Sequence, residues 1–428
     1  MSRTRHRLGR ALSLLALVVL LAAALMWWQG TRSDSTSHAT APSHHNDAEL
    51  IQRGAYLAQI GNCAACHTVA HGEPFAGGRA IPTQFGTFYG SNITPDPQYG
   101  IGTWSAEDFW RALHEGKRPD GTLLYPAFPY TSYTQLSRAD ADALHAYLKS
   151  QPAVAQPNAA HQLGFPYNQR WLLAFWRALH FEPATFTPDL DQTPLWNRGA
   201  YLVGGLGHCA ECHTPRNRLG GLQPDQALAG TLMPMADWFA PALTPSSVNG
   251  LAGWSEDDLA DLLRLGHTRF GVAAGPMAEV VFDSSQHLST ADAQAMAHYL
   301  LAQNPGPQTR PEPIANRLHT QGGQLYAQNC ASCHGERGEG QAPGWPALAG
   351  NLTLNLSDPV NAIRKVLDGG FAPGTAGNPQ PYGMPPFRHR LSDTDIAAIL
   401  SYTRNQWGNA AAPVAPNDVR RARLLAAH

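Results

Sequence analysis

The first part of the chain combines a basic stretch with a long apolar run. Residues 1–10 carry four arginines and no acidic residue, and residues 11–28 contain no charged residue. As a helix rising about 1.5 Å per residue, this run would extend about 27 Å, close to the thickness of a bilayer's hydrocarbon core. Trp27 and Trp28 end the run, where interfacial aromatic residues are expected. The pattern therefore predicts a membrane-spanning helix within residues 1–30.

Two interpretations of this N-terminal segment follow from its flanks. Basic residues stay on the cytoplasmic side of a membrane, so an uncleaved anchor would place the rest of the chain outside the cytoplasm. The alternative is a cleaved signal peptide, with Ala22 and Ala24 forming an A-x-A site. We favour the anchor because the apolar core of a signal peptide usually has about 7–15 residues. Residues 31–47 are polar and predict a flexible linker.

Beyond the linker, apolar residues recur at the three- and four-residue spacing of short amphipathic helices. Ala141, Leu144, Tyr147 and Leu148 show this spacing in one of them. Serines suited to cap a helix precede most of these segments, and in each of the three closing helices an aspartate follows the serine three residues later. No segment shows the repeated alternation of a strand. The predicted helices lie at 104–116, 136–150, 254–266, 288–302, 358–370 and 391–405.

The same order of features occurs three times along the chain. RGAYLAQIGNCAACHT begins at Arg53, RGAYLVGGLGHCAECHT at Arg198, and a shorter GGQLYAQNCASCHG at Gly322. A Gly/Pro-rich loop, a short helix, a second loop and a closing helix follow each. This order predicts a mainly α chain of three tandem domains, whose long loops leave each domain too little apolar sequence for a core of its own. The predicted boundaries are 48–182, 190–304 and 316–414, with Pro-rich joins between them.

Composition narrows the class of protein. Charged residues make up 14% of the chain, against about 25% in an average soluble protein, which argues against a coiled coil or a long helical bundle. The 40 glycines and 34 prolines fit loop-rich domains without reaching the level of a low-complexity chain. A formal net charge of -2 and an isoelectric point near 6.8 provide no field that would attract nucleic acid, so we expect no nucleic-acid partner.

All six cysteines fall in three Cys-x-x-Cys-His motifs, and this spacing has a specific chemistry. Two thiols one helical turn apart add to the two vinyl groups of haem, and the adjacent histidine is then held beside the iron as an axial ligand. The porphyrin would supply the apolar core that each domain lacks. The sequence thus predicts three covalently bound haem c groups. Their cysteines and proximal histidines are Cys63, Cys66 and His67, then Cys209, Cys212 and His213, then Cys330, Cys333 and His334.

Other uses of paired cysteines fit these motifs less well. Structural disulfides occur in exported proteins, but they would not require a histidine beside every pair. A thioredoxin-type dithiol needs a β-α-β context, which the hydrophobic pattern does not indicate. A zinc site of this kind needs two such pairs. We therefore retain haem attachment as the function of all three motifs.

The opposite axial position of each iron requires a second ligand, and methionine is the soft ligand that raises the haem potential. Met277 in GPMAEV and Met384 in YGMPPF occur at the same point of their repeats, shortly before the closing helix. The first repeat breaks this pattern, because Phe128 in LYPAFPY stands at the matching position and cannot bind iron. The first haem is then five-coordinate or takes a ligand from elsewhere. The histidines of that repeat, none of which stands out, are His71, His114, His145, His161 and His180.

At these motifs the sequence resembles the three-haem cytochrome c subunits of periplasmic, membrane-bound dehydrogenases. The resemblance covers roughly residues 50–417 and implies that Met277 and Met384 are distal haem ligands. The first repeat of this family often contains LYPAMPY, from which LYPAFPY departs at Phe128. The matching segments are RGAYL before the first two haem motifs, GxWSxxD, GPMAEVV at 275–281, LAGN at 348–351 and GNPQPYGMPPF at 377–387.

The resemblance implies an electron-transfer subunit without catalytic residues of its own. It implies a catalytic dehydrogenase partner of molybdenum, quinone or flavin type, and ubiquinone or a terminal oxidase as electron acceptor. The protein would lie in the inner cell membrane, with its haem domains facing the periplasm. The alternatives are a peroxidase-like haem enzyme acting at an open first haem, and a haem-based sensor or scaffold. Residues 165–181 also belong to the resemblance, and the helical spacing of their aromatic residues favours domain packing over contact with a membrane or partner.

Overall fold

The computed structural model describes residues 2–33, 47–233, 235–246, 249–305, 317–341 and 344–425. About 46% of the chain is helical. Contacts divide the chain into two compact units, each of which is described by itself. The first comprises residues 1–55, 66–187 and 218–221, and the second comprises residues 56–65, 188–217 and 222–428. The second and third haem motifs both lie in the second unit. Most of the predicted linker, residues 34–46, is outside the described residues.

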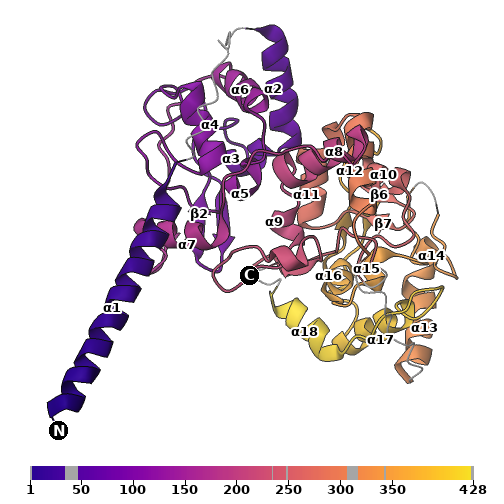
Figure 1. Cartoon of the computed structure of the whole chain (residues 1–428). Helices are drawn as coiled ribbons and strands as arrows, with labels where there is room; N and C mark the ends of the chain where they lie inside the picture. The colour runs from indigo at the N-terminus through magenta and orange to yellow at the C-terminus, as the bar shows by residue number, and fades with distance from the viewer. Residues whose placement is uncertain are drawn as a thin grey trace. The chain divides into compact units, whose positions relative to one another are not determined.

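The first unit begins with the long helix α1 (Ser2–Thr31) (Figure 1). From Ala11 to Thr31 it is long and apolar enough to cross a membrane, a test that a signal sequence near the N-terminus also passes. Most of the apolar side chains along this stretch are exposed. The end of α1 contacts α7 (Leu173–His180) so closely that a Cβ at Gly30 would lie 1.7 Å from the carbonyl oxygen of Ala174. Only glycine fits at this crossing.

Short helices and a small sheet form the remainder of the first unit. Helix α4 (Ala106–Glu115) contacts both α5 (Tyr130–Tyr133) and α6 (Arg138–Lys149). Strand β2 is the middle strand of an antiparallel sheet, in which Ala80 pairs with Tyr89 and Gly86 pairs with Leu163. The division between the units falls within α2 and α3. The elements are α2 (Ala48–Ile60), α3 (Cys63–His67), β1 (Ala80–Thr83), β2 (Gly86–Tyr89), α4 (Ala106–Glu115), α5 (Tyr130–Tyr133), α6 (Arg138–Lys149), β3 (Gln162–Leu163) and a short 3-10 helix η1 (Arg170–Leu172).

The second unit contains two successive sets of short helices and hairpins. The set around the second haem motif comprises α8 (Pro194–Tyr201), the π-helical turn η2 (Leu202–Leu206), α9 (Ala210–His213), η3 (Pro224–Gln226), β4 (Thr231–Met233), β5 (Trp238–Ala240), α10 (Glu256–Leu265), β6 (His267–Thr268), β7 (Gly271–Val272), α11 (Pro276–Asp283), η4 (Ser285–His287) and α12 (Thr290–Leu301). The set around the third motif comprises α13 (Arg317–Asn329), α14 (Ala331–His334), α15 (Leu352–Asn355), α16 (Val360–Asp368), β8 (Gly370–Phe371), β9 (Gly383–Met384), α17 (Asp393–Thr403) and α18 (Pro416–Leu425).

One helix crossing recurs in all three repeats. The helix before each haem motif meets the closing helix at a glycine, where a Cβ atom would clash with a backbone carbonyl oxygen. The clash distances are 1.9 Å for Gly54 on Ala143, 2.0 Å for Gly199 on Ala295 and 2.2 Å for Gly322 on Ala398. The crossing therefore requires glycine at the same position of each repeat.

The predicted serine caps of the closing helices are confirmed. Ser137, Ser289 and Ser392 each accept a hydrogen bond from the backbone N–H of the aspartate three residues later. Only Asp395 also bonds back to the backbone of its capping serine. Asp292 instead pairs with Arg198, at 2.7 Å. Arg198 directly precedes the crossing glycine Gly199, and in the third repeat Gln321 directly precedes Gly322. The neutral Gln321 does not compete for the aspartate, which explains the difference.

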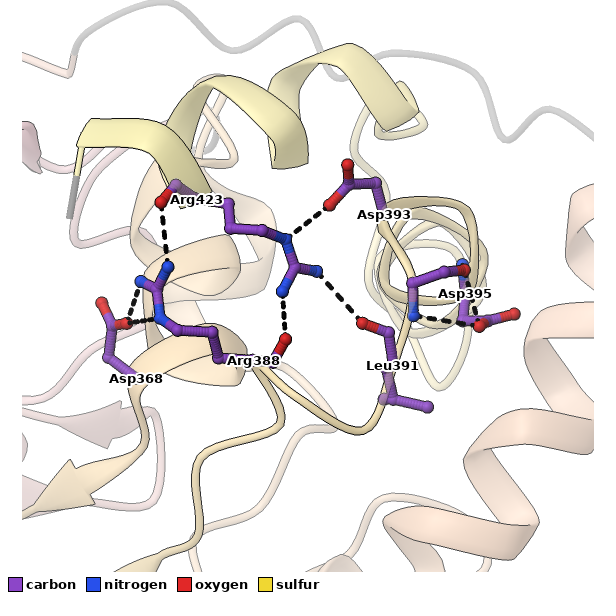
Figure 2. A network of polar contacts seen from close by, with 7 residues as sticks. Asp368, Arg388, Leu391, Asp393, Asp395 and Arg423 are labelled. Carbon is purple, nitrogen blue, oxygen red and sulfur yellow. Dashed lines mark hydrogen bonds and ion pairs between the residues drawn. The ribbon is translucent and has the colours of Figure 1, made fainter. Parts of the chain in front are cut away.

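The C-terminal helix α18 is joined to α16 and α17 by reciprocal arginine contacts (Figure 2). Arg423 donates to the carboxylate of Asp393 at 2.7 Å and to the carbonyl oxygen of Leu391 at 3.1 Å. It also donates to the carbonyl oxygen of Arg388, whose own guanidinium binds Asp368 and, at 2.9 Å, the carbonyl oxygen of Arg423. These contacts hold the segment between β9 and α17 in place.

The described residues contain more strand than the sequence indicates. Besides the three-stranded sheet there are three antiparallel hairpins, β4-β5, β6-β7 and β8-β9. Their strands have only two or three residues, which is too short for an alternating pattern to be visible in the sequence. The expectation of helices and loops alone was therefore wrong at these turns.

Candidate haem sites

Three short helices carry the haem motifs. Helix α3 contains the first motif whole, from Cys63 to His67. Helices α9 and α14 begin directly after the first cysteine of their motifs and end at the histidine. In the second motif the backbone N–H of His213 donates to the carbonyl of Cys209 at 3.0 Å, and the third motif repeats this bond at the same distance. One helical turn thus positions two thiols and an imidazole together, as haem attachment requires.

Each proximal histidine is oriented by a backbone carbonyl. The distance from Nδ1 to the carbonyl oxygen is 2.6 Å from His67 to Ser91, 2.6 Å from His213 to Pro241 and 2.9 Å from His334 to Pro346. Because a carbonyl oxygen only accepts, Nδ1 carries the proton and the Nε2 lone pair is left available. Burial lowers the pKa of all three imidazoles and favours the neutral form that binds a metal.

A cavity of about 920 Å³ in the second unit is lined by the second and third haem motifs together. Both cysteines and the histidine of each motif face it. Its volume is near the upper end of the range of about 300–1,000 Å³ that is usual for ligand and cofactor sites. Its walls are mainly apolar, which fits a porphyrin that completes the core. Apolar lining residues include Leu251, Trp254, Leu259, Leu354, Ile399 and Leu400.

Burial favours the neutral form of the first thiol of each motif in this cavity. Burial, followed by the neighbouring cysteine, raises the pKa of the Cys209 thiol to about 12 and that of the Cys330 thiol to about 11. A metal site of thiolate type would instead lower the thiol pKa. Within the described ranges, no group of three or more His, Cys, Asp or Glu side chains is placed to hold a metal ion. The donor set therefore fits thioether attachment of haem better than direct metal binding.

Both predicted methionine ligands line the same cavity. Met277 lies in the first turn of α11, and Met384 ends β9, where it pairs with Gly370. Met233 and Met296 also line the cavity. Met296 lies on the closing helix α12 and is almost fully buried, as expected of a packing residue. Facing the cavity does not by itself select the ligand, so the assignment of Met277 and Met384 stays a prediction.

The backbone places Phe128 at the position of Met277. The N–H of Leu124 donates to the carbonyl of Gly116 at 2.8 Å, and the N–H of Ala273 donates to Gly266 in the same way at 2.8 Å. Phe128 lies four residues after the donor Leu124, and Met277 lies four residues after the donor Ala273. The ring of Phe128 is half-buried and lies 5.4 Å from the ring of Tyr133. The structure thus agrees with the sequence alignment that gives the first repeat an aromatic ring in place of the thioether.

The histidines considered for the first haem make other contacts. His114 and His145 are buried, and each has a ring nitrogen bonded to a backbone carbonyl. His161 accepts a backbone N–H at Nδ1, at 3.2 Å, so its own proton lies on Nε2 and blocks that atom as a ligand. His180 lies beside the ring of Trp176, and His71 is exposed on a loop. These contacts do not single out any of the five as a substitute for methionine.

The sequence analysis missed the carbonyl groups that orient the proximal histidines. Ser91 and Pro241 each stand four residues before the proline of the NITP and ALTP segments. These segments are visible in the sequence as repeated loop motifs, so their recurrence after the first two haem motifs could have indicated a shared structural function. The identity of the carbonyl partner became clear only from the fold.

Comparison with known proteins agrees with this geometry. The cytochrome c family model matches residues 51–152 and 320–407. The cytochrome c subunit of alcohol dehydrogenase (quinone) from Gluconobacter oxydans is 38% identical over 413 residues, which cover 92% of this chain and 86% of the relative. The gluconate 2-dehydrogenase cytochrome c subunit of Pantoea cypripedii is 41% identical over 407 residues, covering 89% and 91%. The fructose dehydrogenase cytochrome subunit of Gluconobacter japonicus is 36% identical over 451 residues, covering 97% and 90%.

Identity of this extent over nearly the whole length of both chains, together with matching haem-attachment helices, establishes the family. The relatives are named as cytochrome c subunits and not as the catalytic subunits of their dehydrogenases. The chain belongs to the family of cytochrome c subunits of dehydrogenases, which are electron-transfer subunits and not enzymes in their own right.

Proposed function

We propose that this chain is a three-haem electron-transfer subunit with one haem c in each of the segments 48–182, 190–304 and 316–414. The observation that carries the proposal is the common geometry of the three motif helices, each with its imidazole Nδ1 bonded to a backbone carbonyl. The volume and apolar walls of the cavity in the second unit support two of the three groups there. The remaining group, the haem of the first motif, is inferred from the equivalent helix α3.

The residues of each site have separate tasks. The cysteine pairs would hold the porphyrin by thioether bonds, and His67, His213 and His334 would bind iron through Nε2. Haem, when bound, supplies a one-electron couple. Met277 and Met384 would also hold the second and third irons, where a thioether ligand would raise the potential. The apolar cavity walls exclude water from both sites, which also tunes the potential.

We propose that electrons enter from a catalytic dehydrogenase subunit and leave to ubiquinone or a terminal oxidase. The names of the relatives support a dehydrogenase partner, for which we propose the molybdenum, quinone or flavin type. The apolar helix α1 supports attachment to the inner cell membrane, with the haem segments on the periplasmic side. An uncleaved anchor gives the exposed apolar side chains of α1 a non-aqueous environment.

Purification from membranes tests this proposal. We expect a dehydrogenase to co-purify with the full chain, and the substrate of that dehydrogenase to reduce the haems of the complex. If no dehydrogenase accompanies the protein and no substrate oxidation is coupled to haem reduction, the proposal fails. A mature N-terminus at the start of the chain supports the anchor, and one just after Ala24 supports a cleaved signal peptide.

Phe128 is the single observation that favours a second function, a haem enzyme of peroxidase type at an open first iron. Such a site would give high-spin absorption features and bind carbon monoxide or cyanide. A protein whose haems are all low-spin and inert to both ligands would exclude this alternative.

A further inference from the structure

The end of the N-terminal helix α1 is fixed to the first unit by two buried cations. Arg177 donates from Nε to the carbonyl oxygen of Gly30 at 2.7 Å. Lys117 donates from Nζ to the carbonyl oxygens of Thr31 and Arg32, both at 2.9 Å. Both side chains are almost fully buried, and cations at a helix C-terminus also interact favourably with the helix dipole. The orientation of α1 and that of the surrounding residues are therefore linked.

Helix α7 contacts the C-terminal end of α1, where Trp27 and Trp28 lie (Figure 1). The rings of Trp27 and Phe175 lie 6.1 Å apart, and Gly30 contacts the backbone of Ala174. Tryptophans at the end of a membrane-spanning helix lie at the level of the lipid headgroups. If α1 spans the membrane, α7 is held at that level.

The side of α7 next to this contact is apolar and exposed. Phe175 and Leu179 are four residues apart and so share a face of α7, and Trp171 in the preceding η1 continues this face, with its ring 6.1 Å from that of Phe175. Trp171 is 54% exposed, Leu179 is 58% exposed and Phe165 in the preceding loop is 82% exposed. Residues 162–181 contain no acidic side chain. Such a surface suits insertion among lipid headgroups, including anionic ones.

We infer that α7 and its preceding loop form an interfacial platform, residues 163–181, that rests in the headgroup region of the bilayer beside α1. The inference rests on the proposed anchor and adds a second membrane contact to it. The occupant is the lipid surface, because the platform is continuous with the membrane-spanning helix. The consequence is that the first unit, with Cys66 and His67, is held at a defined height and orientation above the membrane. Domain packing, the interpretation favoured by helical spacing alone, accounts for Leu173 and Ala174 but not for the exposed residues.

Photocrosslinking to lipid tests the platform directly. The full chain is reconstituted in vesicles of phosphatidylcholine and phosphatidylglycerol that contain a phospholipid with a diazirine near its headgroup, and crosslinked peptides are identified by mass spectrometry. We expect crosslinks in α1 and in residues 163–181. A matched control is the peptide around Leu190, which is 96% exposed but lies outside the platform. It should give several-fold fewer crosslinks.

A pair of charge substitutions sharpens the result. Phe165→Glu is expected to lower crosslinking of residues 163–181 several-fold while crosslinking of α1 is retained, and Leu190→Glu should leave both unchanged. Crosslinks in α1 without crosslinks in 163–181 would overturn the platform and leave the anchor intact. Absence of crosslinks from both segments would contradict the proposed anchor. Crosslinks in residues 163–181 that are lost when a dehydrogenase subunit is bound would assign this surface to the partner protein instead.

Discussion

The atom that carries the proton on the imidazole separates the three predicted haem-binding histidines from His161, although His114 also has its Nδ1 bonded to a backbone carbonyl. His67, His213 and His334 direct Nδ1 at carbonyl oxygens and leave Nε2 as a free donor of electrons. His161 has the opposite arrangement, because its Nδ1 accepts a backbone N–H. The sequence identified the first three from their cysteine neighbours, but it held no information on tautomers. The distinction needed the backbone that surrounds each ring.

Met384→Leu tests the distal ligand of the third haem. Leucine has a similar volume but no sulfur, so we expect the third haem to become high-spin and its potential to fall. Absorption spectroscopy and a redox titration measure both changes. Met296→Leu, in the same cavity but on the closing helix, should leave the spectrum unchanged. An unaltered spectrum in Met384→Leu would show that another residue is the ligand.

Phe128→Met tests the unusual first repeat. The backbone register puts residue 128 where Met277 stands in the second repeat, so the new thioether should reach the first iron and make it six-coordinate. We expect the fraction of haem that binds carbon monoxide to fall. The reciprocal change Met277→Phe should open the second iron and raise that fraction. A wild-type protein that binds no carbon monoxide would show that the first iron already has a sixth ligand.

At the scale of elements, the sequence predicts helices better than it predicts their contacts. The capping serines and the six predicted helix positions match the structure to within about two residues at each end. The partner of Asp292 could not be predicted in this way, because Arg198 is distant in sequence. The equivalent aspartate of the third repeat, Asp395, instead bonds to the capping serine of its own helix α17. The hairpins were missed because their strands are too short to show a period. Local signals are visible in the sequence, whereas pairings that depend on the fold are not.

Asp292→Asn tests the contact between α8 and α12. Burial opposes ionisation of Asp292, but hydrogen bonds from Arg198 and Tyr56 outweigh burial and lower its pKa. A carboxylate with a lowered folded-state pKa stabilises the fold above its unfolded pKa, and the stabilisation is lost as the pH falls through the folded-state pKa. We expect the variant to lose about 2 kcal/mol of unfolding free energy at neutral pH.

The difference in unfolding free energy between this variant and the wild type should shrink below a pH of about 4, where aspartate protonates in the unfolded chain. Denaturant unfolding at neutral and acidic pH measures it. The exposed Asp225→Asn provides a matched control with little expected effect at either pH. A difference that stays constant with pH would mean that the ion pair is not its cause.

For the whole molecule, spacing and repetition in the sequence were more informative than composition. Three Cys-x-x-Cys-His motifs were sufficient to predict the cytochrome c family, and the exception predicted at Phe128 stays a prediction. The division into two compact units was not predicted, and neither was the cavity lined by His213 and His334 together. Both result from contacts between segments more than a hundred residues apart, such as the bond from Phe239 N–H to the side chain of Asn361 at 2.8 Å. No local pattern encodes such contacts.

The central claim is that one polypeptide holds three redox-active haem c groups. A reductive titration of the purified full chain, with polypeptide concentration determined independently, measures this claim most directly. The account predicts three electrons taken up reversibly per chain, with the absorption spectrum of c-type haem throughout. Uptake of two electrons or fewer by fully haem-loaded protein would contradict it. Release of haem from the denatured chain, which would mean that no thioether bonds hold it, would also contradict it.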